Sequence, residues 1–73
     1  MVKVILLDYR WCIGYFGKSN ADSILRQVKK LSYTEDNLPK IGESIDMGGF
    51  YLEVMEYDSE RKVLKVMYEK DKR

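Results

Sequence analysis

The chain has 73 residues, 45% of them hydrophobic, and its 13 Lys/Arg and 12 Asp/Glu residues leave a net charge of +1. A chain of this length holds a single domain, residues 1–73, and its one cysteine, Cys12, excludes an internal disulfide. Histidine is absent and no run of about 18 apolar residues occurs, which excludes an ordinary zinc site and a membrane-spanning helix. We therefore expect no metal and no other cofactor. We also expect a cytoplasmic location, because the N-terminus lacks the pattern of a signal peptide.

The small net charge hides an uneven distribution along the chain. Residues 1–31 contain six Lys/Arg and two Asp/Glu, whereas residues 32–57 contain one and six. The basic and acidic parts can attract each other within one fold, or one of them can face an oppositely charged partner.

The N-terminal part of the chain predicts two strands. Residues 2–7 are apolar on both faces and rich in β-branched side chains, which is typical of a strand covered on both sides. Aromatic side chains and glycines crowd residues 8–18. We therefore expect a turn near residues 8–11 and a second short strand at residues 12–16, which Gly17 ends.

One helix is predicted, over residues 20–31, with Ser19 as its N-cap. Apolar side chains recur there at the i, i+3, i+4, i+7 spacing of one helical face: Ala21, Ile24, Leu25, Val28 and Leu31. This stripe can cover one face of a sheet.

Residues 38–69 predict a β-meander. Its strands are expected at residues 43–46, 50–57 and 62–69, with a tight turn at the glycine pair 48–49. Alternation divides the apolar side chains of the long strand between one face with Phe50, Leu52 and Val54 and another with Tyr51, Met55 and Tyr57. The charged residues 70–73 are expected to fray.

The element order β-β-α-β-β-β predicts an α+β domain. We expect a small, curved antiparallel sheet, SH3-like or a partly open barrel, with the helix packed across it. A chain this short has little material to cover a second apolar face. That face packs on the N-terminal hairpin or is left for another molecule, and association would also stabilise so small a domain.

Residues 38–54 carry a recurrent pattern. The run Leu38-Pro39-Lys40-Ile41-Gly42-Glu43 is followed, after four residues, by Gly48-Gly49-Phe50-Tyr51-Leu52-Glu53-Val54. The stretch resembles the LPxxGE…GxYxV β-hairpin of short, mostly uncharacterised proteins of bacteriophages and Gram-positive bacteria, and the resemblance covers only the meander, residues 38–69. The resemblance implies a small, non-enzymatic cytoplasmic protein of phage type, and it supplies no catalytic residues.

Side chains that commonly carry catalysis are few. Cys12 has no histidine to activate it, and a small buried hydrophobe is the simpler interpretation of this residue. Glu53 and Glu56 fall on opposite faces of a regular strand and cannot converge on a substrate there. We therefore do not expect an enzyme.

The preferred function is that of a non-catalytic protein-binding module, such as a phage-type modulator or inhibitor of a host protein. Tyrosine and methionine within a charged rim are typical of binding patches, and the same patch could join two copies in a homo-oligomer. The contact candidates are Trp11, Tyr15, Phe16, Tyr51, Met55 and Tyr57.

Two alternatives stay open. Aromatic rings beside cations resemble a stacking platform for single-stranded nucleic acid, although the same rings can simply furnish a small core. The residues of that platform would be Tyr9, Arg10, Trp11, Lys18, Arg26, Lys29 and Lys30. The third function is sequestration of a small ligand or nucleotide in a pocket at a dimer seam.

Overall fold

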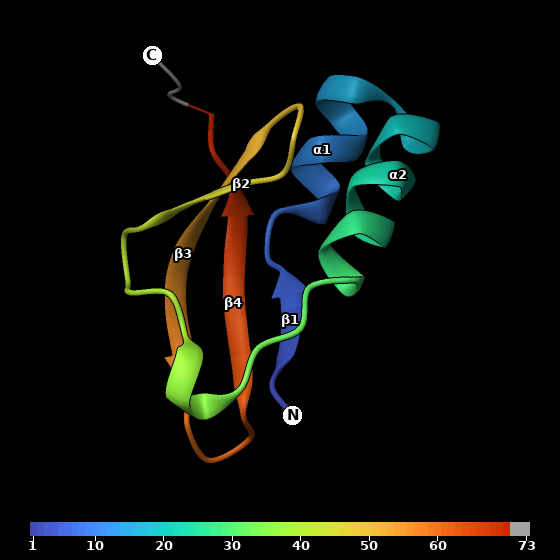
Figure 1. The fold of residues 1–73 in the computed structure, drawn as a ribbon. Coiled ribbons are helices and arrows are strands. Elements are labelled where there is room, and N and C mark those ends of the chain that lie inside the picture. Colours follow the sequence, from blue (N-terminus) through green and yellow to red (C-terminus); the bar gives the residue numbers. More distant parts are fainter. Residues whose placement is uncertain (71–73) are drawn as a thin grey trace.

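The computed structural model describes residues 1–70. Along the chain its elements are β1 (Lys3–Leu6), α1 (Tyr9–Phe16), α2 (Lys18–Lys29), the 3-10 helix η1 (Glu35–Asn37), β2 (Ser44–Asp46), β3 (Tyr51–Asp58) and β4 (Val63–Tyr68). Figure 1 shows the two helices together on the β1 side of the sheet, and the chain after α2 passing through η1 and returning outside β3. The mixture of helices and strands confirms the predicted α+β class.

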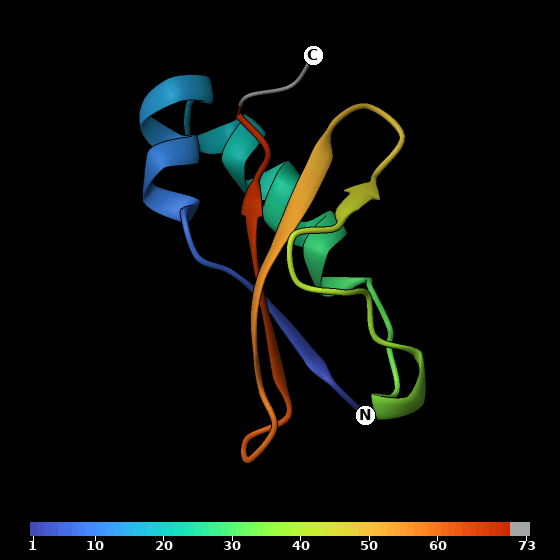
Figure 2. The same cartoon turned by 90° about the vertical axis from the view of Figure 1, so that its left-hand side faces the viewer.

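The strands form one open sheet in the order β1-β4-β3-β2. β3 pairs antiparallel with β2 and β4, as the meander predicts, whereas β1 pairs parallel with β4 and places Val4 opposite Leu64. The prediction of a purely antiparallel sheet is therefore wrong, and within residues 1–70 no pairing closes the sheet into an SH3-like barrel. Figure 2 shows the twist of the sheet, with β1 running at an angle to β3 and β4.

Residues 9–16 form helix α1, so the strand predicted at residues 12–16 is wrong. Tyr9, Cys12, Ile13 and Phe16 stand at the i, i+3, i+4 and i+7 positions of a helix, and all four pack on the core. The aromatic side chains favour a strand locally, but only a helix turns these four to one side. Apart from η1, the element order is β-α-α-β-β-β rather than β-β-α-β-β-β.

Gly17 separates the two helices. Its φ of 93° lies in the left-handed region that glycine adopts without strain. Its N–H donates to the Ile13 carbonyl at 2.8 Å, and its own carbonyl accepts from the Ala21 N–H at 2.9 Å. Helix α2 thus begins at Lys18 with Gly17, not Ser19, as the N-cap residue, and it ends before the predicted limit at residue 31. No helix among the described residues is long and apolar enough to cross a membrane.

The core lies between one face of the sheet and the inner sides of both helices. Its buried side chains are Val2, Val4, Leu6, Cys12, Ala21, Ile24, Val28, Leu52, Val54, Leu64 and Val66. In β1, Val4 and Leu6 are buried while Lys3 is exposed, so this strand is covered on one face and not on both as predicted. The face opposite the helices, called the open face below, carries the alternate side chains of the strands.

A β-bulge interrupts β3 at Met55. Val54 pairs with Val66, but Glu56 pairs with Lys65 and Tyr57 with Leu64, so the register shifts between Val54 and Glu56. A shift by one residue moves the following side chains to the other face. Tyr57 consequently lies on the core side, and the prediction that it shares a face with Tyr51 is wrong.

The same bulge changes the relation between two carboxylates. Glu53 pairs with Met67 and Glu56 with Lys65, two positions apart on β4, so both glutamates belong to the open face. The prediction that they lie on opposite faces is therefore wrong. Glu56 is engaged by the Lys65 ammonium at 3.6 Å.

Candidate functional site

Helix α1 presents two aromatic rings to solvent. Trp11 and Tyr15 are four residues apart, so they lie one turn apart on the same side of the helix. Their rings are stacked, with centroids 4.9 Å apart and planes inclined by 9°. Trp11 is 36% exposed and Tyr15 is 70% exposed.

Phe16 and Tyr68 back these two rings. Phe16 meets Tyr15 edge-on with centroids 4.8 Å apart, and Tyr68 of β4 lies 5.0 Å from Phe16 and 5.9 Å from Trp11. Each aromatic pair contributes about 0.5–1.5 kcal/mol beyond the burial of its area. We call Trp11, Tyr15, Phe16 and Tyr68 the aromatic surface, because together they form one contiguous group of rings held against the core.

A shallow hollow accompanies the aromatic surface. Its volume is about 370 Å³, and its lining consists of the four rings together with Glu69 and Lys70. The hollow therefore combines an apolar floor with one anionic and one cationic residue at its rim.

An ion pair fixes Lys70 beside the rings. Its ammonium lies 2.8 Å from a carboxylate oxygen of Asp8 and 4.6 Å from the centroid of the Trp11 ring. The second Asp8 oxygen accepts the backbone N–H of Tyr68 at 3.2 Å. Asp8, whose side chain is only 8% exposed, thereby ties the start of α1 to the end of β4.

The remaining residues predicted for protein binding lie elsewhere. Tyr51 is half-buried on the open face, and Met55, at the bulge, is 39% exposed. Tyr57 lies on the core side, and its hydroxyl donates to Glu35 of η1 at 3.1 Å. The structure thus brings Trp11, Tyr15 and Phe16 together and separates them from the other three.

Glu35 is bound on both of its oxygens. Lys62 donates to Oε1 at 3.1 Å, and the Tyr57 hydroxyl donates to Oε2. These hydrogen bonds, that from Lys62 above all, hold the pKa of the Glu35 carboxyl below its usual value. Tyr57 therefore connects β3 to η1, which leaves its hydroxyl committed within the fold.

The predicted nucleic-acid platform is also divided. Tyr9 turns toward α2, where its hydroxyl donates to Asp22, and the Lys18 ammonium lies 2.7 Å from the other oxygen of the same carboxylate. Trp11 belongs to the aromatic surface. Arg10 in α1, Arg26 and Lys29 in α2, and the following Lys30 are exposed cations. The structure thus stacks none of the predicted cations on Trp11 or Tyr9, and the cation at Trp11 is Lys70.

The Asp22 contacts predict a specific dependence of stability on pH. Hydrogen bonds from Lys18 and then Tyr9 lower the pKa of Asp22 in the folded protein. A carboxyl whose pKa is lower when folded stabilises the fold above its unfolded pKa of about 3.9, and this contribution is lost as pH falls through the folded value. We expect Asp22→Asn to lower the urea midpoint at pH 7 and to have little effect at pH 2.

The control for this prediction is Asp36→Asn, which removes an exposed carboxylate in η1. Its urea midpoint should follow that of the parent protein across the same pH range. An Asp22→Asn effect of equal size at both pH values would show that the carboxylate charge contributes nothing.

Cys12 is a core residue. The side chain is fully buried, and loss of hydration raises the pKa of its thiol, with a smaller contribution from the Asp8 carboxylate. A thiol with a raised pKa is protonated at neutral pH and reacts slowly. Within residues 1–70, no group of three or more His, Cys, Asp or Glu side chains could hold a metal ion.

The sequence reasoning missed Asp8, Tyr68 and Lys70. Alternation with Leu64 and Val66 places Tyr68 on the core side of its strand, but only the parallel pairing of β1 with β4 brings it to α1. Lys70 was expected to fray with its neighbours, yet it is held by Asp8 and Trp11. The rest of that expectation, residues 71–73, lies outside the described residues. No local signal marks the Asp8–Lys70 pair, because it joins the two ends of the chain.

Comparisons of the chain with protein-family models, with curated proteins and with solved structures found no match.

Proposed function

We propose that this protein is a non-catalytic protein-binding module whose contact region is the aromatic surface. One observation carries the proposal: the stacked rings of Trp11 and Tyr15 face solvent while Phe16 and Tyr68 fix them from behind. Tryptophan and tyrosine are the side chains that most often dominate the energy of protein interfaces.

The arrangement suits binding because it is already ordered. Both exposed rings stand on one helix and are stacked on each other, so little side-chain entropy remains to be lost when a partner arrives. Glu69 and Lys70 beside the hollow supply the charged rim that surrounds the apolar centre of many interfaces. An apolar or aromatic side chain of the partner would fill the hollow between them.

The partner is another protein or a second copy of this chain. A homodimer through the aromatic surface would cover the exposed rings and also stabilise a domain of this size. The resemblance of residues 38–69 to phage and Gram-positive hairpins favours a modulator of a host protein. The single, buried thiol suits the reducing conditions of the cytoplasm.

Tyr15→Ala tests the proposal, because this side chain is mostly exposed and its loss should leave the fold intact. We expect capture of partners from a cell lysate to fall at least tenfold. If the protein self-associates, we expect the dimer dissociation constant measured by sedimentation to rise at least tenfold. Truncation of a central aromatic residue commonly costs about 2 kcal/mol or more in binding, which is roughly thirtyfold. The readouts are quantitative mass spectrometry of the captured proteins and sedimentation velocity.

Ile41→Ala is the matched control, since Ile41 is also an exposed apolar side chain but lies outside the aromatic surface. Its binding should equal that of the parent protein. The proposal would be contradicted if the parent protein were a monomer that captured no protein from the lysate. It would also be contradicted if the parent protein, Tyr15→Ala and Ile41→Ala captured equal amounts. Binding of oligothymidylate that weakens steeply with salt and is lost in Tyr15→Ala would instead support the nucleic-acid alternative.

A further inference from the structure

The outer edge of β1 has no neighbouring strand in the sheet that residues 1–70 form. The N–H of Lys3 donates at 2.9 Å to the carbonyl of Lys62, which directly precedes β4, and the N–H of Leu7 donates at 2.8 Å to the Val66 carbonyl of β4. Successive residues of a strand direct their backbone groups to opposite edges, so Val4 and Leu6 face away from β4. β1 is an edge strand, and β4 is its one neighbour in the sheet that residues 1–70 form.

Extended backbone already pairs with one end of this edge. The Val2 N–H donates to the Tyr33 carbonyl at 3.1 Å, and the two residues form an isolated antiparallel bridge. Among residues 1–70, the next outward positions along the strand, Val4 and Leu6, have no such bridge. The chain thus pairs with this edge at Val2 and leaves the positions Val4 and Leu6 for an added strand.

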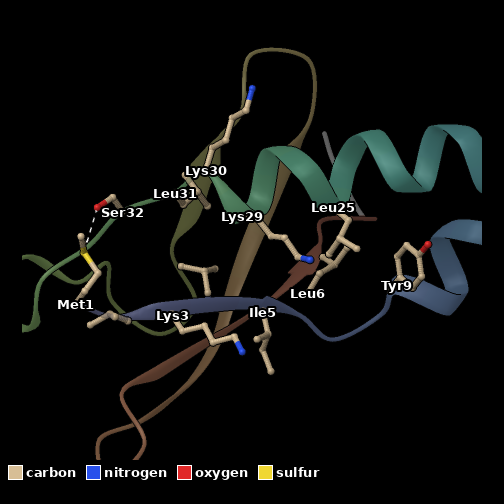
Figure 3. A pocket seen from close by; sticks show the side chains of 12 residues that line it. Met1, Lys3, Ile5, Leu6, Tyr9, Leu25, Lys29, Lys30, Leu31 and Ser32 are labelled. Carbon is tan, nitrogen blue, oxygen red and sulfur yellow. Dashed lines mark hydrogen bonds between the residues drawn. The ribbon is translucent and has the colours of Figure 1, made fainter.

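A groove runs along this edge beneath helix α2. Its volume is about 640 Å³, and its floor and walls include Val4, Leu6, Leu25 and Leu31. Figure 3 shows β1 along one side of the groove and the C-terminal half of α2 along the other. Met1 and Ser32 close one end through a contact of 3.3 Å between the hydroxyl and the thioether sulfur.

Two cations flank the free edge on its two faces. Figure 3 shows the Lys29 side chain running from α2 toward β1, whereas Lys3 projects on the opposite side of the strand, next to Ile5. Neither lysine has a carboxylate within ion-pair distance among residues 1–70. Alternate side chains of an added strand would point to these two faces in turn.

We propose that β1 binds an extended, acidic segment of a partner protein, which adds to the sheet as a further edge strand. The outward backbone groups of Val4 and Leu6 hydrogen-bond to the segment, and its apolar side chains contact Leu25 and Leu31. Its carboxylates meet Lys29 on one face and Lys3 on the other. Strand addition of this kind gains affinity from the main chain and specificity from the alternating side chains.

The charges select this occupant over a second copy of the chain. Pairing of β1 with β1 of another copy would bring Lys3 and Lys29 of both copies to one seam, and facing like charges destabilise paired strands. Lys3 on the edge strand and Lys29 beside it in α2 discourage self-association while they attract a segment of opposite charge. The edge of β1 and the aromatic surface share no residue, so binding at one can be absent while binding at the other is present.

The test uses a blocked peptide of repeating Val-Val-Glu-Glu, which places valine and glutamate on both faces of an extended strand. Titrated into isotope-labelled protein, it should shift the amide resonances of Val4 and Leu6 saturably and slow their hydrogen exchange. Lys29→Glu should weaken this binding roughly tenfold, because an attraction becomes a repulsion of similar size.

Lys30→Glu is the matched control, since it makes the same charge change at the neighbouring residue, whose side chain points away from β1 in Figure 3. Its affinity should stay within about twofold of the parent protein. Although Lys30 lines the groove, its side chain points into solvent and away from β1, where salt screens its charge. A repeating Val-Val-Lys-Lys peptide, and a Val-Val-Glu-Glu peptide methylated on its backbone nitrogens, should not bind.

Several results would overturn the inference. They are the absence of saturable shifts at Val4 and Leu6, equal weakening by Lys29→Glu and Lys30→Glu, and equal binding of the methylated peptide. Binding of decanoate in the groove without binding of the peptide would assign the groove to a small anionic amphiphile instead.

Discussion

Leu64→Ala is expected to leave the protein largely unfolded at room temperature. Leu64 is fully buried in β4, where it lies between Val4 of β1 and Tyr57 of β3. Replacing a buried leucine by alanine costs about 2–5 kcal/mol, through lost burial and the cavity that remains. A single core in a domain of this length supplies only about 3–5 kcal/mol of net stability, so one such cavity is comparable to the whole.

Far-UV circular dichroism and urea titration followed by Trp11 fluorescence measure this loss. Leu7→Ala is the matched control, because it deletes the same atoms from a side chain that is 48% exposed immediately after β1. Its free energy of unfolding should change by about 0.5 kcal/mol or less. A Leu64→Ala protein that unfolds at the same urea concentration as Leu7→Ala would show that β4 is not the centre of the core.

The central place of β4 is what the sequence could not predict. The meander itself follows from local pattern: β2, β3 and β4 lie within the predicted segments 43–46, 50–57 and 62–69 to within a residue or so at each end. Dense alternation and the turn at Gly48, whose φ is 95°, encode these strands. Parallel pairing of β1 with β4 joins residues about sixty positions apart, and no short-range signal encodes it.

Helix α1 shows how two patterns can compete in one segment. The aromatic side chains of Trp11, Tyr15 and Phe16 have high strand propensity, while the core-facing stripe of Tyr9, Cys12, Ile13 and Phe16 has helical spacing. Tertiary packing decides between them, because the stripe reaches the core only as a helix. Composition singles out Trp11, Tyr15 and Phe16 as contact candidates, but the stacking of Trp11 on Tyr15 depends on the helix.

The bulge at Met55 limits prediction in a different way. Neither glycine nor proline marks it, so strict alternation through Met55 and Tyr57 was the natural expectation. One extra residue sends Tyr57 to the core side and gathers Glu53 and Glu56 on the open face. Alternation predicts the correct faces for Tyr51, Leu52 and Val54, which precede the bulge. It fails for Tyr57, which follows the shift of register.

Asp8→Ala is expected to cost about 1.5–3 kcal/mol of unfolding free energy and to loosen the aromatic surface at the same time. The change removes the acceptor for the Tyr68 N–H and the partner of the Lys70 ammonium, both at a nearly buried position. Hydrogen bonds to charged groups contribute in this range, and the donor left without its acceptor adds to the loss. Urea titration gives the stability.

Asp8→Asn separates the two contributions, because its amide oxygen can still accept the Tyr68 N–H while the charge that holds Lys70 is gone. We expect Asp8→Asn to keep about half of the unfolding free energy that Asp8→Ala loses. In both variants the Trp11 fluorescence of the native protein should change, because Lys70 no longer stays 4.6 Å from that ring. Asp36→Ala, at an exposed carboxylate of η1, should change neither quantity. Asp8 joins the first turn of α1 to the end of β4. If Asp8→Ala lost no more unfolding free energy than Asp36→Ala, the rings would be held by their mutual packing alone.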